Sequence, residues 1–188
     1  MKQFQKTLPD YLRPGLRILF VGINPGLKSA ATGHHFAGPS NRFWKLLYES
    51  GLIDIALTYQ EDFRLPEWGL GLTNIITRTS AGIDTLEPSE YRAGLHALEE
   101  KIIQYQPCTI ALLGVTIFRM IFPLQTSGAG PATLGLTNVR LADTPVFLLP
   151  NPSGRNAHYA YGQMLQAFTM LRKHRDRSHP SQTIGRED

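Results

Sequence analysis

Three short segments of the sequence place polar or aromatic side chains directly after apolar runs. The first is GINPG at residues 22–26, the second is GHHF at 33–36, and the third is LPNPSGRN at 149–156. Such segments could cradle a phosphate, bind a cation through His34 and His35, or supply Ser153 as a nucleophile. They could also hold the carboxamide of Asn24 against a water molecule. The spacing of the residues decides between these chemistries.

Three of these chemistries fit the spacing poorly. GINPG lacks the spacing of a P-loop, G-x-x-x-x-G-K-[ST], and of the dinucleotide motif G-x-G-x-x-G. His34 and His35 are adjacent and lack cysteine or carboxylate partners at zinc-binding spacing, so we expect no metal. Ser153 lies in Asn-Pro-Ser-Gly rather than in a nucleophile elbow. Asn24 therefore remains the candidate for a chemical role, as the residue that holds a water molecule. The alternative is that Asn24-Pro25-Gly26 is only a turn that reverses the chain.

The surrounding pattern predicts the elements that would position these residues. Apolar runs bounded by turn residues predict strands at 16–22, within 67–74, at 109–113 and at 146–149. Apolar spacing of three and four residues predicts helices at 41–48, 88–105, 115–122 and 161–173. Ser40 is expected to cap the first of these helices and Gly51 to end it. Residues 123–138 are expected to form a loop.

Strands that alternate with helices predict an α/β fold, with three layers and a central, mainly parallel sheet. In such sheets, ligands bind beyond the carboxyl ends of the strands. The loops at 22–36, 72–80 and 150–158 should therefore gather at one edge. We expect a single domain over residues 1–172, with an N-terminal arm at 1–12 and a flexible basic tail at 173–188.

Composition narrows the class of protein. The chain has 188 residues, of which 42% are hydrophobic and 18% charged, as is ordinary for a soluble globular protein. It shows neither a membrane-length apolar run nor a signal-peptide core, so we expect a cytoplasmic protein with no membrane partner. The single Cys108 excludes an internal disulfide and a cluster ligated by several cysteines. The net charge of +4 supports a polyanionic partner only weakly, because part of the basic excess lies in the run Arg172, Lys173, Arg175 and Arg177.

Several blocks, in this order, make the sequence resemble the mismatch-specific uracil/thymine-DNA glycosylases of the uracil-DNA glycosylase superfamily. The resemblance covers about residues 12–171. It rests on GINPGL at 22–27, GHHF at 33–36, NRFWK at 41–45, GLTN at 71–74, YQP at 105–107 and LPNPSG at 149–154. It implies the α/β/α fold of that superfamily, a monomer, and no metal or organic cofactor.

The resemblance also implies roles for the residues of the first two segments. Asn24 matches the residue that positions the attacking water, and Phe36 matches the aromatic ring on which the extruded base stacks. The main-chain groups of Ile23 and Phe36 are expected to recognise the pyrimidine edge. His35 matches a position that lines the pocket, and Ser29 lies where the 5-methyl group of thymine would approach.

Two further positions have both a functional and a structural interpretation. Asn74 matches a pocket residue that contacts the base or the water, and the alternative is a loop asparagine that bonds its own backbone. His34 is expected to be structural and paired with nearby backbone.

The third segment matches the loop that enters the minor groove in relatives and recognises the orphaned guanine. Gly154 is expected to allow that close approach, and Ser153 to bind a backbone phosphate. Relatives with Leu after this glycine differ from this chain, where Arg155 follows directly. Arg155 either fills the gap left by the base or only contacts phosphate. The expected DNA-binding residues are Asn151, Pro152, Ser153, Gly154, Arg155 and Asn156.

These inferences predict a monofunctional DNA glycosylase that acts on duplex DNA with a G·U or G·T mismatch. It would extrude uracil and hydrolyse the N-glycosidic bond as the first step of base excision repair, with thymine and etheno-cytosine as further substrates. A carboxamide is not a useful general base, so bond cleavage should be largely dissociative. No lysine stands where a Schiff-base nucleophile is expected. Two alternatives remain open: a non-catalytic binder of abasic or mismatched DNA with the same fold, and a nucleotide-binding enzyme that uses GINPG as a phosphate cradle.

Overall fold

The computed structural model describes residues 7–123 and 133–178, which form a five-stranded sheet flanked by helices. The strand order is β2-β1-β3-β5-β4. The strands are β1 (Ile18–Gly22), β2 (Leu70–Asn74), β3 (Ile110–Leu113), β4 (Gly135–Leu141) and β5 (Thr144–Leu149). Only β4 is antiparallel to its neighbour. The predicted mixed α/β fold with a mainly parallel sheet is confirmed.

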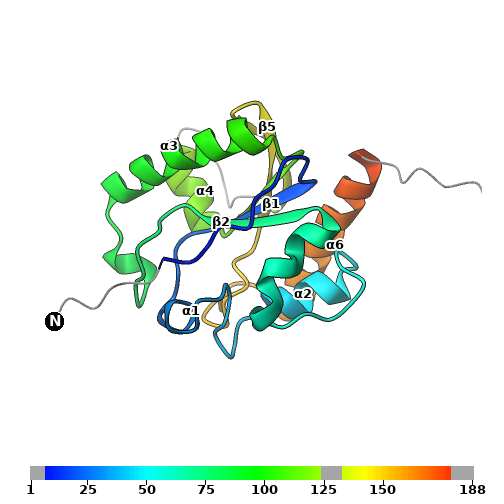
Figure 1. Ribbon diagram of the computed structural model, residues 1–188, viewed down its shortest axis with the longest axis horizontal. Helices are drawn as coiled ribbons and strands as arrows, with labels where there is room; N and C mark the ends of the chain where they lie inside the picture. The colour runs from blue at the N-terminus through cyan, green and yellow to red at the C-terminus, as the bar shows by residue number, and fades with distance from the viewer. Residues whose placement is uncertain (1–6, 124–132, 179–188) are drawn as a thin grey trace, which may run out of the picture.

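Helices cover both faces of the sheet, and each face has its own apolar core. Figure 1 shows α3 (Pro88–Tyr105) and α4 (Val115–Ile121) on one side, and α2 (Phe43–Glu49) and α6 (Tyr161–Ser178) on the other. Every residue of β1 is buried, because its side chains alternate between the two cores. Phe20 of β1, for example, meets Phe43 of α2 edge to face, with ring centroids 5.3 Å apart. Shorter helical segments are α1 (Leu27–Thr32) and the 3-10 turns Tyr59–Trp68 and Ile83–Thr85.

The expected loop at 123–138 was wrong over its last residues, which belong to β4. Residues 124–132 lie outside the described part of the chain. β4 is an edge strand with alternating burial, and its Leu136 is 56% exposed, so it has no continuous apolar run. The turn into β5 places Ala142 and Asp143 at φ 42° and 61°, a tight hairpin turn without the usual glycine. The sequence therefore lacked the common signals of a hairpin.

Two helix boundaries also differ from the expected ones. α2 begins at Phe43, and its N-cap residue is Arg42 rather than Ser40. The backbone N–H of Phe43 donates to Oδ1 of Asn41 over 3.0 Å. Gly51 ends this helix as predicted, at φ 75° and with its N–H donating to Tyr48.

The final helix extends further than the sequence indicated. α6 continues to Ser178, past the expected boundary at 172, and so takes in the start of the predicted tail. There Arg175 donates to the carbonyl of Leu52 over 2.9 Å and forms an ion pair with Asp176. Part of the basic run is therefore bound to the body of the protein. Residues 179–188 lie outside the described chain.

The N-terminal arm is attached to the edge of β2 over its last residues. Tyr11 and Leu72 exchange two backbone hydrogen bonds of 2.9 and 3.0 Å. Asp10 pairs with Lys101 of α3 over 2.6 Å and accepts a hydrogen bond from Thr73. The arm thereby covers an edge strand that would otherwise expose unpaired backbone groups.

Candidate active site

A cavity of about 710 Å³ lies beyond the carboxyl ends of the parallel strands. The three loops that were expected to meet there are brought together by the fold. Of the predicted site residues, those that line the cavity are Ile23, Asn24, Ser29, His35, Phe36, Asn74, Asn151, Ser153, Gly154, Arg155 and Asn156. Pro152 is buried and is not part of the lining. Its carbonyl instead accepts a hydrogen bond from the backbone of Arg42.

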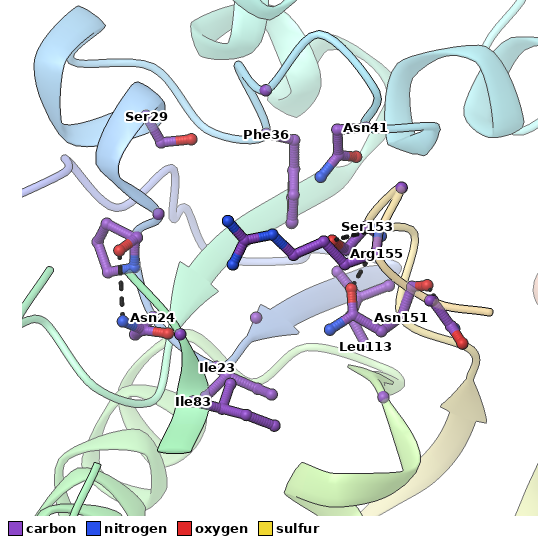
Figure 2. Close-up of a pocket in the computed structure, with 18 of the residues that line it drawn as sticks. Ile23, Asn24, Ser29, Phe36, Asn41, Ile83, Leu113, Asn151, Ser153 and Arg155 are labelled. Carbon is purple, nitrogen blue, oxygen red and sulfur yellow. Dashed lines mark hydrogen bonds between the residues drawn. The ribbon is translucent and has the colours of Figure 1, made fainter. Parts of the chain in front are cut away.

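Asn24 is held at the end of β1 by its side-chain nitrogen. Nδ2 donates to Oγ of Ser80 over 2.8 Å and to the carbonyl of Arg78 over 3.1 Å, and lies 3.3 Å from the carbonyl of Pro25. Carbonyl oxygens can only accept, so this geometry assigns the nitrogen to that side of the carboxamide. Oδ1 then faces the cavity, as Figure 2 shows. An acceptor in that position can align a water molecule.

The residues that hold Asn24 are themselves held, Ser80 by the loop before the 3-10 turn Ile83–Thr85 and Arg78 by the start of α3. Ser80 Oγ donates onward to the carbonyl of Gly82 over 2.7 Å. The guanidinium of Arg78 makes two hydrogen bonds to Glu90, of 2.7 and 2.8 Å. Hydrogen bonds from Arg78 and from the backbone of Glu87 lower the pKa of Glu90 to about 2, so the pair stays ionised at neutral pH. Nothing in the local sequence around residues 78–90 marked these residues as supports of Asn24.

Phe36 and Asn74 lie together over the end of β1. The Phe36 ring borders the cavity (Figure 2), and its centroid is 4.1 Å from that of Phe43. A Cβ atom on Gly22 would stand 2.5 Å from Oδ1 of Asn74 and 3.7 Å from the Phe36 ring. Glycine at position 22 therefore permits the close approach of Asn74, whereas the Phe36 ring lies at ordinary van der Waals distance. Phe36 itself has φ 53°, a left-handed conformation that aromatic residues seldom adopt.

His35 lines the cavity as expected but also contacts the N-terminal arm, and His34 has a different partner from the expected one. His35 is 2% exposed, and its Nε2 lies 2.8 Å from the carbonyl of Pro9 in the N-terminal arm. Because a carbonyl can only accept, Nε2 carries the proton, and burial lowers the pKa of the ring. The ring nitrogen Nε2 is thus committed to the arm. His34 pairs through Nδ1 with the carboxylate of Asp62 over 3.0 Å, not with backbone as predicted.

Ser29 serves the structure as well as lining the cavity. It is buried, and its Oγ accepts a hydrogen bond from the backbone N–H of Ala37 over 3.2 Å. Its hydroxyl therefore joins α1 to the residue that follows Phe36.

The loop after β5 is shaped mainly by its own asparagine side chains. Oδ1 of Asn151 accepts from the backbone N–H of Ser153 over 2.9 Å (Figure 2). Nδ2 of Asn156 donates back to the carbonyl of Asn151 over 2.9 Å. These two bonds close a compact turn at the mouth of the cavity.

Gly154 lies directly against Ser40. A Cβ atom at Gly154 would stand 2.3 Å from both Cβ and Oγ of Ser40 and 2.7 Å from its carbonyl oxygen. The sequence suggested a glycine for close approach to DNA, and the structure shows a close approach to another loop of the same chain. A side chain at this position would push the two loops apart.

Arg155 extends across the cavity from the β5 loop. Figure 2 shows its side chain crossing the cavity. Its Nη1 donates to the carbonyl of Ala81 over 2.7 Å, so the side chain links the two loops. This contact was not expected from the sequence. Several further lining residues were also not predicted, among them Asn41, Ser80, Ile83, Leu113 and Tyr159.

Neither a group of metal-binding side chains nor a membrane-length helix is found in the described residues. Within 7–123 and 133–178, no group of three or more His, Cys, Asp or Glu could hold a metal. No helix in the same part of the chain is long and apolar enough to cross a bilayer. The charged residues that line the cavity include the cations Lys28 and Arg155 and the carboxylate Asp84.

Comparison with known proteins identifies similar sequences and folds. Residues 9–172 match the family model described as the Uracil DNA glycosylase superfamily. A similar fold occurs in the solution NMR structure of a "putative Uracil DNA glycosylase" from Methanosarcina acetivorans, with a TM-score of 0.60 and 17% sequence identity. The match covers 90% of this chain and 97% of that one. At this identity the likeness shows the fold alone.

Proposed function

Because the chain belongs to the uracil DNA glycosylase superfamily, we propose that it is a monofunctional glycosylase that releases uracil opposite guanine from duplex DNA. The observation that carries the proposal is the Asn24 carboxamide, whose nitrogen is bound on one side and whose oxygen faces the cavity. Beside it lie an aromatic ring, Phe36, and a second carboxamide, Asn74. A water acceptor, a stacking surface and a polar edge are the groups that cleavage of an extruded base needs.

The proposed reaction begins with the base stacked on Phe36 and its polar edge against Asn74 and the main chain of Ile23 and Phe36. The bond between C1′ and the base nitrogen then breaks, and the electron pair leaves with the base. Oδ1 of Asn24 accepts a hydrogen bond from the water whose oxygen bonds to C1′. A carboxamide does not take the proton from this water, so the proton passes to solvent after attack. The barrier therefore falls chiefly through orientation and through electrostatic stabilisation of the leaving base.

Thymine is the substrate for which Ser29 matters most in this proposal. The hydroxyl of Ser29 is fixed by Ala37, so it forms a firm part of the cavity wall. Ser29→Ala is expected to raise the rate on T·G relative to U·G, because it removes an atom from the wall. The ratio of the two single-turnover rates measures this effect. An unchanged ratio would show that Ser29 does not select against the methyl group.

Binding of DNA is proposed to involve the loop at 151–156, with Arg155 exchanging its bond to Ala81 for contacts to the duplex. In the free protein the guanidinium extends across the cavity, so an extruded base requires that bond to open. A planar cation can either stack in the gap left by the base or pair with a phosphate.

The direct test is an excision assay on a labelled duplex with a single U·G pair, followed by alkali to cut abasic sites. The expected result is a strand break, slower with T·G and weaker with U·A or single-stranded uracil. A folded protein that binds abasic duplex but releases no uracil would support the non-catalytic alternative. Thermal stabilisation by mononucleotide phosphates, without any excision, would instead support the nucleotide-binding alternative.

A further inference from the structure

Asp62 is a buried carboxylate close to the cavity that the proposed reaction does not use. It lies in the 3-10 turn Tyr59–Trp68 and is 0% exposed. Its Oδ1 accepts from the hydroxyl of Tyr11 over 2.8 Å and lies 3.0 Å from Nδ1 of His34. Its Oδ2 accepts from the backbone N–H of His35 over 2.8 Å. A buried carboxylate is costly unless such partners are present, so this arrangement calls for a role.

The groups around Asp62 are hydrogen-bond donors to its carboxylate. Burial, and then the hydrogen bond to Asp62, raise the pKa of Tyr11, so its hydroxyl keeps its proton. A backbone N–H such as that of His35 can only donate. Both oxygens of Asp62 are therefore occupied by donors that come from the arm and from the GHHF segment.

Asp62 holds the backbone of His35, the residue directly before Phe36. The N–H of His35 is bound by Asp62, and its carbonyl accepts from the indole nitrogen of Trp44 over 3.2 Å. On the other side of Phe36, the N–H of Ala37 is bound by Ser29. Phe36, at φ 53°, is thus fixed by hydrogen bonds on both sides. Unfavourable backbone conformations of this kind persist only where the surrounding contacts enforce them.

We propose that Asp62 is a positioning residue for base recognition, which acts by holding the backbone N–H of His35 and with it the left-handed conformation of the next residue, Phe36. The inference rests on the proposed function for its catalytic consequence. The structural part of the inference does not depend on the proposed function, because it concerns how the ring of Phe36 is held over the end of β1.

A double-mutant cycle tests whether Asp62 acts through the ring of Phe36. Asp62→Ala is expected to lower the single-turnover rate of uracil release about tenfold, within the range that loss of base stacking causes. In the background of Phe36→Ala, the same change should alter the rate by less than about twofold, because the ring it positions is gone. An equal loss in both backgrounds would overturn the proposal, since it would show a role that is independent of Phe36.

A conservative variant sharpens the cycle. Asp62→Asn keeps one oxygen for the His35 N–H, and its amide group can donate to the oxygen of Tyr11 and to an unprotonated Nδ1 of His34. Its rate should stay within about threefold of the wild type, because the backbone N–H of His35 remains held. A loss as large as that of Asp62→Ala would show that the charge, and not the hold on His35, is what matters.

Two further variants separate positioning from general loss of stability. Leu141→Ala removes a buried side chain from β4, away from the cavity, and should lower the unfolding midpoint with no change in the rate of excision by the folded protein. Trp44→Phe removes the hydrogen bond to the carbonyl of His35, the other backbone group of that residue, and should repeat the cycle result if Asp62→Ala does not fold.

Crystal structures of the wild type and of Asp62→Ala or Trp44→Phe distinguish failure of this inference from failure of the proposed function. If residue 36 keeps its positive φ and its ring does not move in the variant, the inference is overturned, whether or not the wild type releases uracil. A shifted residue 36 in a variant, together with no uracil release by the wild type, would keep the positioning role and reject the proposed reaction.

Discussion

The loop after β1 and the loop after β5 both reach the cavity, but different contacts hold them. After β1, the carboxamide of Asn24 is bound by Ser80 and Arg78, and the backbone N–H of His35 is bound by the buried Asp62. After β5, the turn is closed mainly by its own side chains, and the exposed guanidinium of Arg155 makes one hydrogen bond, to Ala81. A group that makes several hydrogen bonds away from solvent is held in one position. A group with a single exposed hydrogen bond readily exchanges that bond for another.

This difference suggests a division of labour between the two loops. The β1 side is suited to hold groups that must be in place before the substrate arrives, as pre-organised catalysis requires. The β5 side is suited to exchange a contact within the protein for one with DNA. The predictions below test this division, since variants on the β1 side should affect the reaction and variants on the β5 side should affect binding.

Asn24→Ala should have the largest effect. We expect the single-turnover rate on U·G duplex to fall on the order of 100-fold, because the water loses the group that aligns it. The affinity for abasic duplex should change little, as measured by fluorescence anisotropy. Asn138→Ala, at an exposed position on β4, provides the matched control and should leave both quantities unchanged. Unimpaired turnover by Asn24→Ala would reject the water-positioning role.

Arg155→Ala should have an intermediate effect, and on binding rather than on cleavage. The affinity for duplex should fall roughly fivefold at physiological salt, and the slope of log affinity against log salt should decrease by about one, since one phosphate contact is lost. The rate at saturating enzyme should change less than the affinity does. Arg140→Ala, on an exposed edge of β4, is the control of equal charge. A fall in rate comparable to that of Asn24→Ala would contradict the division between the loops.

His35→Gln should have the smallest effect, visible only in the dependence of stability on pH. Burial lowers the pKa of His35, so the unfolded chain takes up a proton first as the pH falls below about 6.5. Wild-type stability should therefore decline through that range, whereas the glutamine variant keeps a donor for Pro9 and has no group to titrate. Urea unfolding of both proteins between pH 7.5 and 5.5 measures the difference. Parallel curves would show that His35 does not titrate differently in the folded state.

The parts of the fold that were predictable are those whose signals are local. The apolar run of β1 and the periodic helix α3, with Pro88 at its first turn, follow from neighbouring residues alone. β4 was missed because it is an edge strand with alternating burial and a hairpin turn without glycine. Asp62 was missed because a single carboxylate in a loop carries no motif, and its partners come from the arm and from GHHF.

The sequence by itself determined the order of the strands other than β4 and of the longer helices, and it placed the polar motifs at strand ends, because these depend on interactions between near neighbours. It also carried the family resemblance that the match over residues 9–172 supports at the level of the superfamily. Only the tertiary structure decided which way the carboxamide of Asn24 points, which peptide Asp62 holds, and that Arg155 extends to Ala81. Those partners lie between 27 and 74 residues apart in the chain. Such contacts form only when the two cores bring the loops together, so no local pattern could specify them.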